Sequence, residues 1–124
     1  MIKGIGTDIV EIARIADLLE KHGDIFKKKI FTSNEIEDGV KRKNRPNFFA
    51  GRWAAKEAFS KAIGTGFGAD CSWLDIEIVS NDLGKPEITL KGKAAETAEK
   101  LGVSSIHLSI SHEESYACAM VVAE

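Results

Sequence analysis

The sequence predicts one α+β domain over residues 1–124, in which a mostly antiparallel sheet packs against helices. The length of 124 residues, with 44% apolar and 29% charged residues, is typical of a single compact domain with a real core. Helical and strand-like segments follow one another in the order β-α-α-α-β-β-α-β-β. Turn-forming residues join most of the later strands, so hairpins and antiparallel pairing are expected.

The N-terminal part predicts a short strand followed by two helices. Ile2 to Asp8 is expected to form the strand, and Ile9 to Lys21 a helix, because its apolar residues recur on one face. Gly23 is expected to end this helix. Thr32-Ser33-Asn34-Glu35 has the form of a capping box, so a further short helix is expected to begin there.

The strongest helical pattern runs from about Pro46 to Ile63 and ends at Gly64-Thr65-Gly66. Since successive residues are turned by about 100° on a helix, its polar side chains form two small stripes roughly a quarter turn apart. The stripes consist of Arg52 with Lys56, and of Glu57 with Lys61.

The second half of the chain predicts a hairpin, a helix and two further strands. The expected ranges are Trp73–Val79 and Glu87–Leu90 for the hairpin, Lys93–Leu101 for the helix, a strand through Ile106, Leu108 and Ile110, and Tyr116–Val122 for the last strand. In the first hairpin strand, alternation predicts that Leu74, Ile76 and Ile78 face inward.

Charge is uneven along the chain. The net charge is −2, but residues 1–61 carry 13 Lys/Arg and 9 Asp/Glu, giving +4, while residues 62–124 carry 4 and 10, giving −6. The basic runs Lys27–Lys29 and Lys41–Arg45 supply most of the excess. They suit either an anionic partner or a solvated surface. Nucleic acid is disfavoured as that partner, because few aromatic residues interrupt these runs.

Cysteine and hydropathy point to an ordinary cytoplasmic protein. Cys71 and Cys118 lack the spacing of a metal or redox motif, and their apolar surroundings predict buried free thiols. No apolar stretch approaches the ~18 residues that span a bilayer, so no membrane association is expected.

Four local patterns carry possible chemistry, and each has a plain alternative. Gly4-Ile5-Gly6 is a weak phosphate-binding signal, and the nearby Asp8 suits a helix cap as well as a metal ligand. Glu57 and Lys61 fit a cation and phosphate site, or an ordinary surface pair. His112 follows two serines but lacks an orienting acid, so a hydrogen bond or phosphate contact is favoured over nucleophilic catalysis. Gly84-Lys85-Pro86 is turn chemistry.

Together and in order, these patterns resemble the bacterial holo-acyl-carrier-protein synthases, the small phosphopantetheinyl transferases. The resemblance spans almost the whole chain. Its blocks are Gly6-Thr7-Asp8-Ile9-Val10-Glu11-Ile12-Ala13-Arg14, Phe49-Ala50-Gly51-Arg52-Trp53-Ala54-Ala55-Lys56-Glu57-Ala58-Phe59-Ser60-Lys61, Gly84-Lys85-Pro86 and Ser109-Ile110-Ser111-His112. Residues 44–47 and 93–101 follow no family pattern, which leaves partner preference open.

The resemblance implies transfer of the phosphopantetheine arm of coenzyme A to a serine of an acyl carrier protein, with release of 3′,5′-ADP. It implies that Asp8 and Glu57 bind Mg²⁺, an ion that usually takes only one or two carboxylates from a protein. Lys61 would reach the bridging phosphates. The resemblance leaves Glu57, Lys61 and a metal-bound water as alternatives for the base that activates the serine.

The same resemblance assigns the remaining contacts. Arg52, Lys56 and His112 are implied for the coenzyme's phosphates, and Gly84-Lys85-Pro86 for its adenosine end. Arg14, on the first helix, is implied to dock the acidic carrier protein, which the basic surplus of the first half suits. Such enzymes act in fatty acid biosynthesis and assemble as homotrimers with sites between subunits. The small core of a 124-residue chain also favours association.

Two other functions use the same residues. A magnesium-dependent pyrophosphatase would consume coenzyme A without a carrier protein. A noncatalytic coenzyme-binding module would bind the ligand and turn nothing over.

Overall fold

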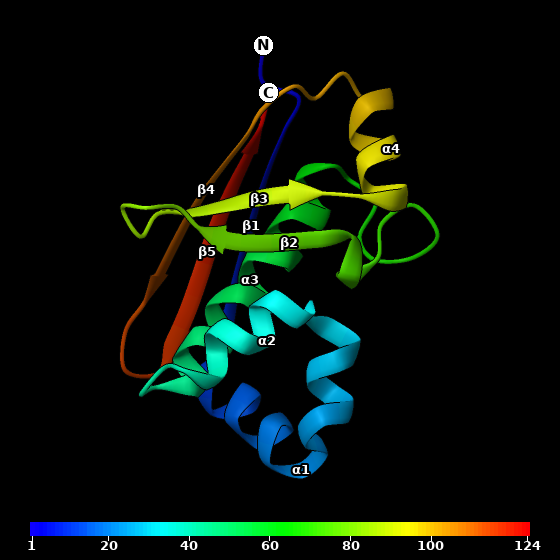
Figure 1. Ribbon diagram of the computed structural model, residues 1–124. Coiled ribbons are helices and arrows are strands. Elements are labelled where there is room, and N and C mark those ends of the chain that lie inside the picture. Colours follow the sequence, from blue (N-terminus) through cyan, green and yellow to red (C-terminus); the bar gives the residue numbers. More distant parts are fainter.

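The computed structural model describes residues 1–124, and helix α3 (Arg45–Ala62) lies at its centre (Figure 1). Beside α3 lies a three-stranded sheet in the order β1-β5-β4, made of β1 (Gly4–Glu11), β5 (Tyr116–Ala123) and β4 (Ile106–His112). Both strand pairs are antiparallel. The predicted α+β class and the predicted order of elements are therefore confirmed.

Two glycines let β1 approach α3 closely. A Cβ atom on Gly4 would lie 1.8 Å from the Ala62 carbonyl oxygen, and one on Gly6 would lie 1.8 Å from the Ala58 carbonyl oxygen. No side chain fits in that space. The Gly-x-Gly pattern therefore serves strand–helix packing. It also brings Asp8, which lies on the same face of β1 as Gly6, toward α3.

Helix α1 (Ile12–Ile30) starts later and ends later than predicted. It starts later because β1 continues its pairing with β5 as far as Glu11, opposite Tyr116. Gly23 does not end the helix as expected; with φ 47° and ψ −122° it only interrupts it, and the chain then resumes a helical path to Ile30. The second part buries Phe26 and Ile30, which accounts for its stability as a helix.

Helix α2 (Ser33–Val40) begins at the predicted capping box. The Thr32 hydroxyl accepts a hydrogen bond from the Glu35 backbone N–H at 3.3 Å, and Glu35 Oε1 accepts one from the Thr32 N–H at 2.8 Å. Glu35 is fully buried, so its carboxylate has partners beyond the cap.

A separate two-stranded antiparallel sheet consists of β2 (Ile76–Ser80) and β3 (Pro86–Leu90). The predicted hairpin is confirmed, but β2 starts later than expected because Trp73–Asp75 forms a turn of 3₁₀-helix. Leu74 is consequently 40% exposed, and its predicted inward position is wrong. The hairpin is not hydrogen-bonded to the larger sheet, and helix α4 (Gly92–Lys100) follows it.

The core lies around α3 and contains 24 buried apolar residues, with an aromatic group at its centre. Cys71 is buried as predicted, whereas Cys118 is exposed on the face of β5 that points away from α3, so its predicted burial is wrong. Ile5, Ile9 and Met120 are also at least half exposed there. This outer sheet face is thus open, and it carries exposed apolar side chains among polar ones such as Ser109 and Ser111. No helix is long and apolar enough to cross a bilayer.

Candidate active site

Helix α3 and strand β1 bring three predicted residues together. Lys61 Nζ lies 3.1 Å from Asp8 Oδ1 and donates a hydrogen bond to the Thr7 carbonyl at 2.9 Å. Asp8 is mostly buried, while about half of the Lys61 side chain is exposed. Glu57 precedes Lys61 by one helical turn. We call Asp8, Glu57 and Lys61 the carboxylate cluster.

Charge within the carboxylate cluster alters the acidity of Glu57. Partial burial raises the pKa of the Glu57 carboxyl, and the nearby Asp8 carboxylate raises that pKa further. The cations Lys61 and Arg14 oppose both effects. A carboxylate whose ionisation is disfavoured by burial and by a second carboxylate belongs to a site that a cation would stabilise.

The carboxylate cluster fits Mg²⁺ better than a metal that needs many protein ligands. The structure contains no group of three or more His, Cys, Asp or Glu side chains placed to hold a metal. Mg²⁺ takes one or two protein carboxylates and completes its coordination with water and phosphate oxygens. Asp8 and Glu57 meet that requirement.

A pocket of about 350 Å³ lies at the other end of α3, between that helix, the β2–β3 hairpin and the end of β4. It brings together three predicted residues, Arg52, Pro86 and His112. Its complete lining is Arg42, Lys43, Asn44, Asn47, Phe48, Gly51, Arg52, Pro86, Ile110 and His112. Several of these side chains are cationic and none is acidic, so we call this cavity the basic pocket.

Arg52 is held firmly at the wall of the basic pocket but is not fully bonded. Its Nη2 donates to Ser80 Oγ at 3.2 Å, and its guanidinium carbon lies 4.3 Å from the centre of the Phe48 ring. The buried Nε–H has no partner. Burial lowers the pKa of Arg52, and the neighbouring Arg42 cation lowers it further. An unpaired N–H beside a second guanidinium is an arrangement that favours an anion.

The sequence alone marks Arg42 and Lys43 only as part of a basic run. Arg42 lies 5.0 Å from the Phe48 ring centre, on the same ring that Arg52 contacts. The signal that would have separated these two residues from Lys27–Lys29 is their position just before the Pro46 helix start, which places them beside Arg52.

Gly84 and Lys85 lie in the hairpin turn, next to the basic pocket but outside its lining. Gly84 has φ 84°, which a residue with a side chain rarely adopts. Asn81 Oδ1 accepts hydrogen bonds from the Leu83 and Lys85 backbone N–H groups at 2.9 and 3.0 Å. The turn is thus ordered and delivers Pro86 to the basic pocket.

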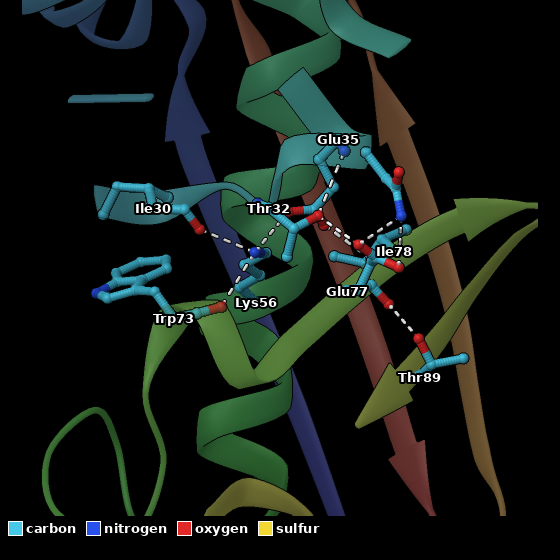
Figure 2. A network of polar contacts seen from close by, with 9 residues as sticks. Ile30, Thr32, Glu35, Lys56, Trp73, Glu77, Ile78 and Thr89 are labelled. Atoms are coloured by element: carbon cyan, nitrogen blue, oxygen red, sulfur yellow. Dashed lines mark hydrogen bonds and ion pairs between the residues drawn. The ribbon is translucent and has the colours of Figure 1, made fainter. Parts of the chain in front are cut away.

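Lys56 does not join its predicted neighbours, and its expected role as a phosphate contact is corrected. Its side chain has no solvent exposure, and its ammonium bonds Glu35 Oε1 at 2.7 Å. The same ammonium donates to the carbonyls of Ile30 at 2.8 Å and Trp73 at 3.0 Å (Figure 2). Burial lowers the pKa of Lys56, and the Glu35 carboxylate opposes this effect. All three N–H donors are used inside the protein, so none remains for a ligand.

Arg14 lies on α1, and its guanidinium carbon is 5.6 Å from the centre of the Trp53 ring. It is exposed and adds to the charges that act on Glu57. A second hollow, of about 630 Å³, starts at Asp8 and Lys61 and crosses the outer sheet face past Ser109, Ser111, Cys118 and Met120. The carboxylate cluster therefore opens between the α1 surface and the apolar sheet face.

Comparison with known proteins identifies the family of this chain. The sequence model of the 4′-phosphopantetheinyl transferase superfamily matches residues 4–121. The holo-[acyl-carrier-protein] synthase of Hydrogenovibrio crunogenus is 49% identical over 124 residues, which is 100% of this chain and 98% of that protein. That of Clostridium novyi is 51% identical over 124 residues and is covered to 88%.

Solved structures of such enzymes share the fold. The crystal structure of holo-[acyl-carrier-protein] synthase from Neisseria meningitidis superposes with a TM-score of 0.93 at 43% identity, covering 100% of this chain and 99% of that one. The Helicobacter pylori enzyme in complex with coenzyme A gives a TM-score of 0.85 at 37% identity, covering 97% and 99%. The chain therefore belongs to the 4′-phosphopantetheinyl transferase superfamily, among its holo-[acyl-carrier-protein] synthases.

Proposed function

We propose that this chain transfers the 4′-phosphopantetheine group of coenzyme A to a serine of an apo-acyl carrier protein, giving the holo-carrier and 3′,5′-ADP. The observation that carries the proposal is that α3 holds Arg52 in an anion-binding pocket and Glu57 in a carboxylate cluster only five positions further on. At about 1.5 Å and about 100° per residue, Glu57 follows Arg52 by about 7.5 Å along the helix and by about 140° around it, so an extended phosphorylated ligand would pass around the helix to reach both residues.

The 3′,5′-ADP end of coenzyme A is proposed to occupy the basic pocket. Arg52, with its unpaired Nε–H, and His112 would bind phosphate oxygens, and Arg42 and Lys43 would add positive charge. The Gly84-Lys85-Pro86 turn would contact the adenosine. Support comes from the Bacillus anthracis enzyme, 42% identical to this chain, whose structure is described as a complex with CoA (3′,5′-ADP).

Asp8 and Glu57 would hold the Mg²⁺, and Lys61 would contact the bridging phosphates. When bound, Mg²⁺ neutralises charge that develops on the pyrophosphate oxygens. The carrier serine oxygen attacks the phosphorus that carries pantetheine, a serine–phosphate bond forms, and the bond to the 3′,5′-ADP oxygen breaks. The protein's own part is mainly to place these groups and to stabilise charge.

The serine must lose its proton during the attack. Without metal, partial burial and the Asp8 carboxylate raise the pKa of Glu57, which favours it as a base, but a Mg²⁺ ion held by the same carboxylate would oppose that rise. Lys61 lies 3.1 Å from Asp8, from where it would stabilise the phosphates. Glu57, Lys61 and a metal-bound water are therefore the candidates for the proton acceptor.

The carrier protein is proposed to dock at α1, where exposed Arg14 stands beside the carboxylate cluster and attracts an acidic partner. The open apolar sheet face is proposed to be covered in a homotrimer, so that the hollow starting at Asp8 and Lys61 lies between subunits. Sedimentation at micromolar protein tests the trimer. The free thiols of Cys71 and Cys118 suit a cytoplasmic location.

Intact-mass measurement tests the reaction directly. Apo-acyl carrier protein is incubated with this chain, coenzyme A and Mg²⁺, and the carrier should gain the mass of phosphopantetheine. A carrier that stays unmodified while coenzyme A disappears would indicate a pyrophosphatase. Binding of coenzyme A without any turnover would indicate a noncatalytic module.

A further inference from the structure

The most heavily bonded buried charges of this protein lie outside both sites. Glu35 and Lys56 are fully buried and form an ion pair of 2.7 Å. The other Glu35 oxygen, Oε2, accepts a hydrogen bond from the Ile78 backbone N–H at 2.8 Å. Figure 2 shows Lys56 between the carbonyls of Ile30 and Trp73, with Glu35 bridging from it to β2. One ion pair thus joins four segments of the chain to α3.

The hairpin depends on such contacts because its backbone does not pair with the larger sheet. The Glu35–Ile78 bond holds the middle of β2. Next to it, Glu77 accepts hydrogen bonds from the Thr32 hydroxyl and from Asn34 Nδ2. At the far end of β2, Arg52 donates to Ser80 Oγ at 3.2 Å. These bonds set where the hairpin stands relative to α3.

The position of the hairpin matters for the basic pocket because the hairpin and α3 both form walls of that pocket. Pro86 reaches the pocket from β3, and Arg52 reaches it from α3. Arg52 lies one helical turn before Lys56, so the ion pair fixes the helix close to the arginine. A shift of the hairpin would change the width of the pocket and would weaken the Arg52–Ser80 bond.

We propose that Glu35 and Lys56 are positioning residues that fix the β2–β3 hairpin against α3 and thereby set the affinity for the 3′,5′-ADP end of coenzyme A. The inference rests on the proposed function of the basic pocket. Neither side chain touches the ligand. Their effect is on the width of the pocket and on the orientation of Arg52.

Glu35→Gln tests the proposal with little change in shape. The glutamine oxygen can still accept a hydrogen bond from Lys56. Its NH₂ group, however, would face the Ile78 backbone N–H, so two donors would meet without an acceptor between them. Calorimetry should give a coenzyme A affinity reduced by about tenfold or more, since small misplacements of binding groups are costly. The KM for coenzyme A should rise similarly, while the KM for the carrier protein stays near the wild-type value.

Ile15→Ala is the control for a general loss of stability. Ile15 is fully buried on α1 and makes no polar contact with the hairpin. It should lower the melting temperature and leave both KM values and the coenzyme affinity nearly unchanged. An equal loss of coenzyme affinity in the two variants would overturn the proposal, and so would wild-type affinity in Glu35→Gln.

A measurement on the wild-type protein avoids dependence on a variant that folds poorly. Coupling between two sites is reciprocal, so bound coenzyme A should slow hydrogen exchange at the Ile78 amide more than at core amides of β5. Equal slowing at all of these amides would overturn the proposal. A wild-type chain that binds coenzyme A but does not modify the carrier would refute the transferase while leaving this coupling intact. A wild-type chain that does not bind coenzyme A would overturn both.

Discussion

Helix α3 supplies the lysines of two lysine–carboxylate pairs, and the two pairs differ. Lys56 and Glu35 have no exposed side-chain surface and lie 2.7 Å apart, whereas Lys61 is 52% exposed and lies 3.1 Å from Asp8, whose side chain is 14% exposed. Every donor of Lys56 is used within the protein. Lys61 also has solvent access and a second carboxylate, Glu57, one turn away.

The difference teaches how to tell a structural ion pair from a functional one. Complete bonding and burial make a pair part of the architecture, because removal of one partner leaves a charge that nothing else neutralises. Partial bonding beside a second carboxylate leaves room and charge for a ligand. Both pairs join a lysine to a carboxylate, so their surroundings rather than their chemistry separate the two roles.

The largest effect that would test this comparison is on stability. Lys56→Met should lower the free energy of unfolding by about 3–5 kcal/mol, because it leaves the Glu35 carboxylate buried without its cation. Urea denaturation measures the loss. The matched variant Lys61→Met should change stability by less than about 1 kcal/mol, as is usual for a partly exposed pair. Similar losses in both variants would remove the distinction.

The next largest expected effect is on activity. At the exposed pair, activity should fall while stability stays nearly unchanged, the reverse of what is expected at the buried pair. Asp8→Ala should reduce carrier modification by about a hundredfold or more, about 2.7 kcal/mol in the barrier, because charge on the pyrophosphate loses its main support. The melting curve should stay close to that of the wild type. The control is Glu96→Ala on α4, which removes an exposed carboxylate paired with Lys93. Near-normal turnover of Asp8→Ala at limiting Mg²⁺ would remove Asp8 from the site.

A smaller effect concerns the surface beside the carboxylate cluster. Arg14→Glu should raise the KM for the acyl carrier protein several-fold, about 1 kcal/mol, because repulsion replaces attraction for an acidic partner. The KM for coenzyme A should change less. Added salt should weaken carrier binding of the wild type, since screening acts within about 8 Å at physiological ionic strength. Equal changes in both KM values would place carrier docking elsewhere.

The smallest effect concerns the pH dependence of stability without metal. Burial and Asp8 raise the pKa of Glu57 in the folded chain above its ordinary value of 4.5, so the folded state binds this proton more tightly than the unfolded state. The ionised carboxylate therefore opposes folding once the pH is above both pKa values. Glu57→Gln should be slightly more stable than the wild type at pH 8, and the difference should vanish as the pH falls through the raised pKa. Thermal melts in chelator at several pH values measure this. A variant less stable at pH 8 would contradict the assignment.

The sequence predicted the parts of the fold that depend on neighbours along the chain. The capping box at Thr32 and Glu35, the helix after Pro46 and the hairpin around Gly84 all form as expected. Their signals are local, since each rests on residues within a few positions of one another. Asp8 and Lys61, which the family resemblance assigns to the same reaction, lie 3.1 Å apart.

Other features depended on residues far apart in the sequence. Gly4 and Gly6 are required because the Ala62 and Ala58 carbonyls of α3 lie directly against them, and these residues are more than 50 positions away in the sequence. The function proposed for Arg42 and Lys43 depends on the pocket that they line together with His112. No local pattern marks such distant partners.

By itself, the sequence determined the order of helices and strands and the family, because periodicity, caps and motifs are written in short stretches of chain. Only the tertiary structure decided which lysine of α3 is structural and which is free for a ligand. Lys56 and Lys61 lie on different stripes of the helix, but a helical wheel does not show which stripe is buried. The roles of the two lysines are set by Glu35, Asp8 and the depth of burial, and these depend on how distant segments pack around the helix.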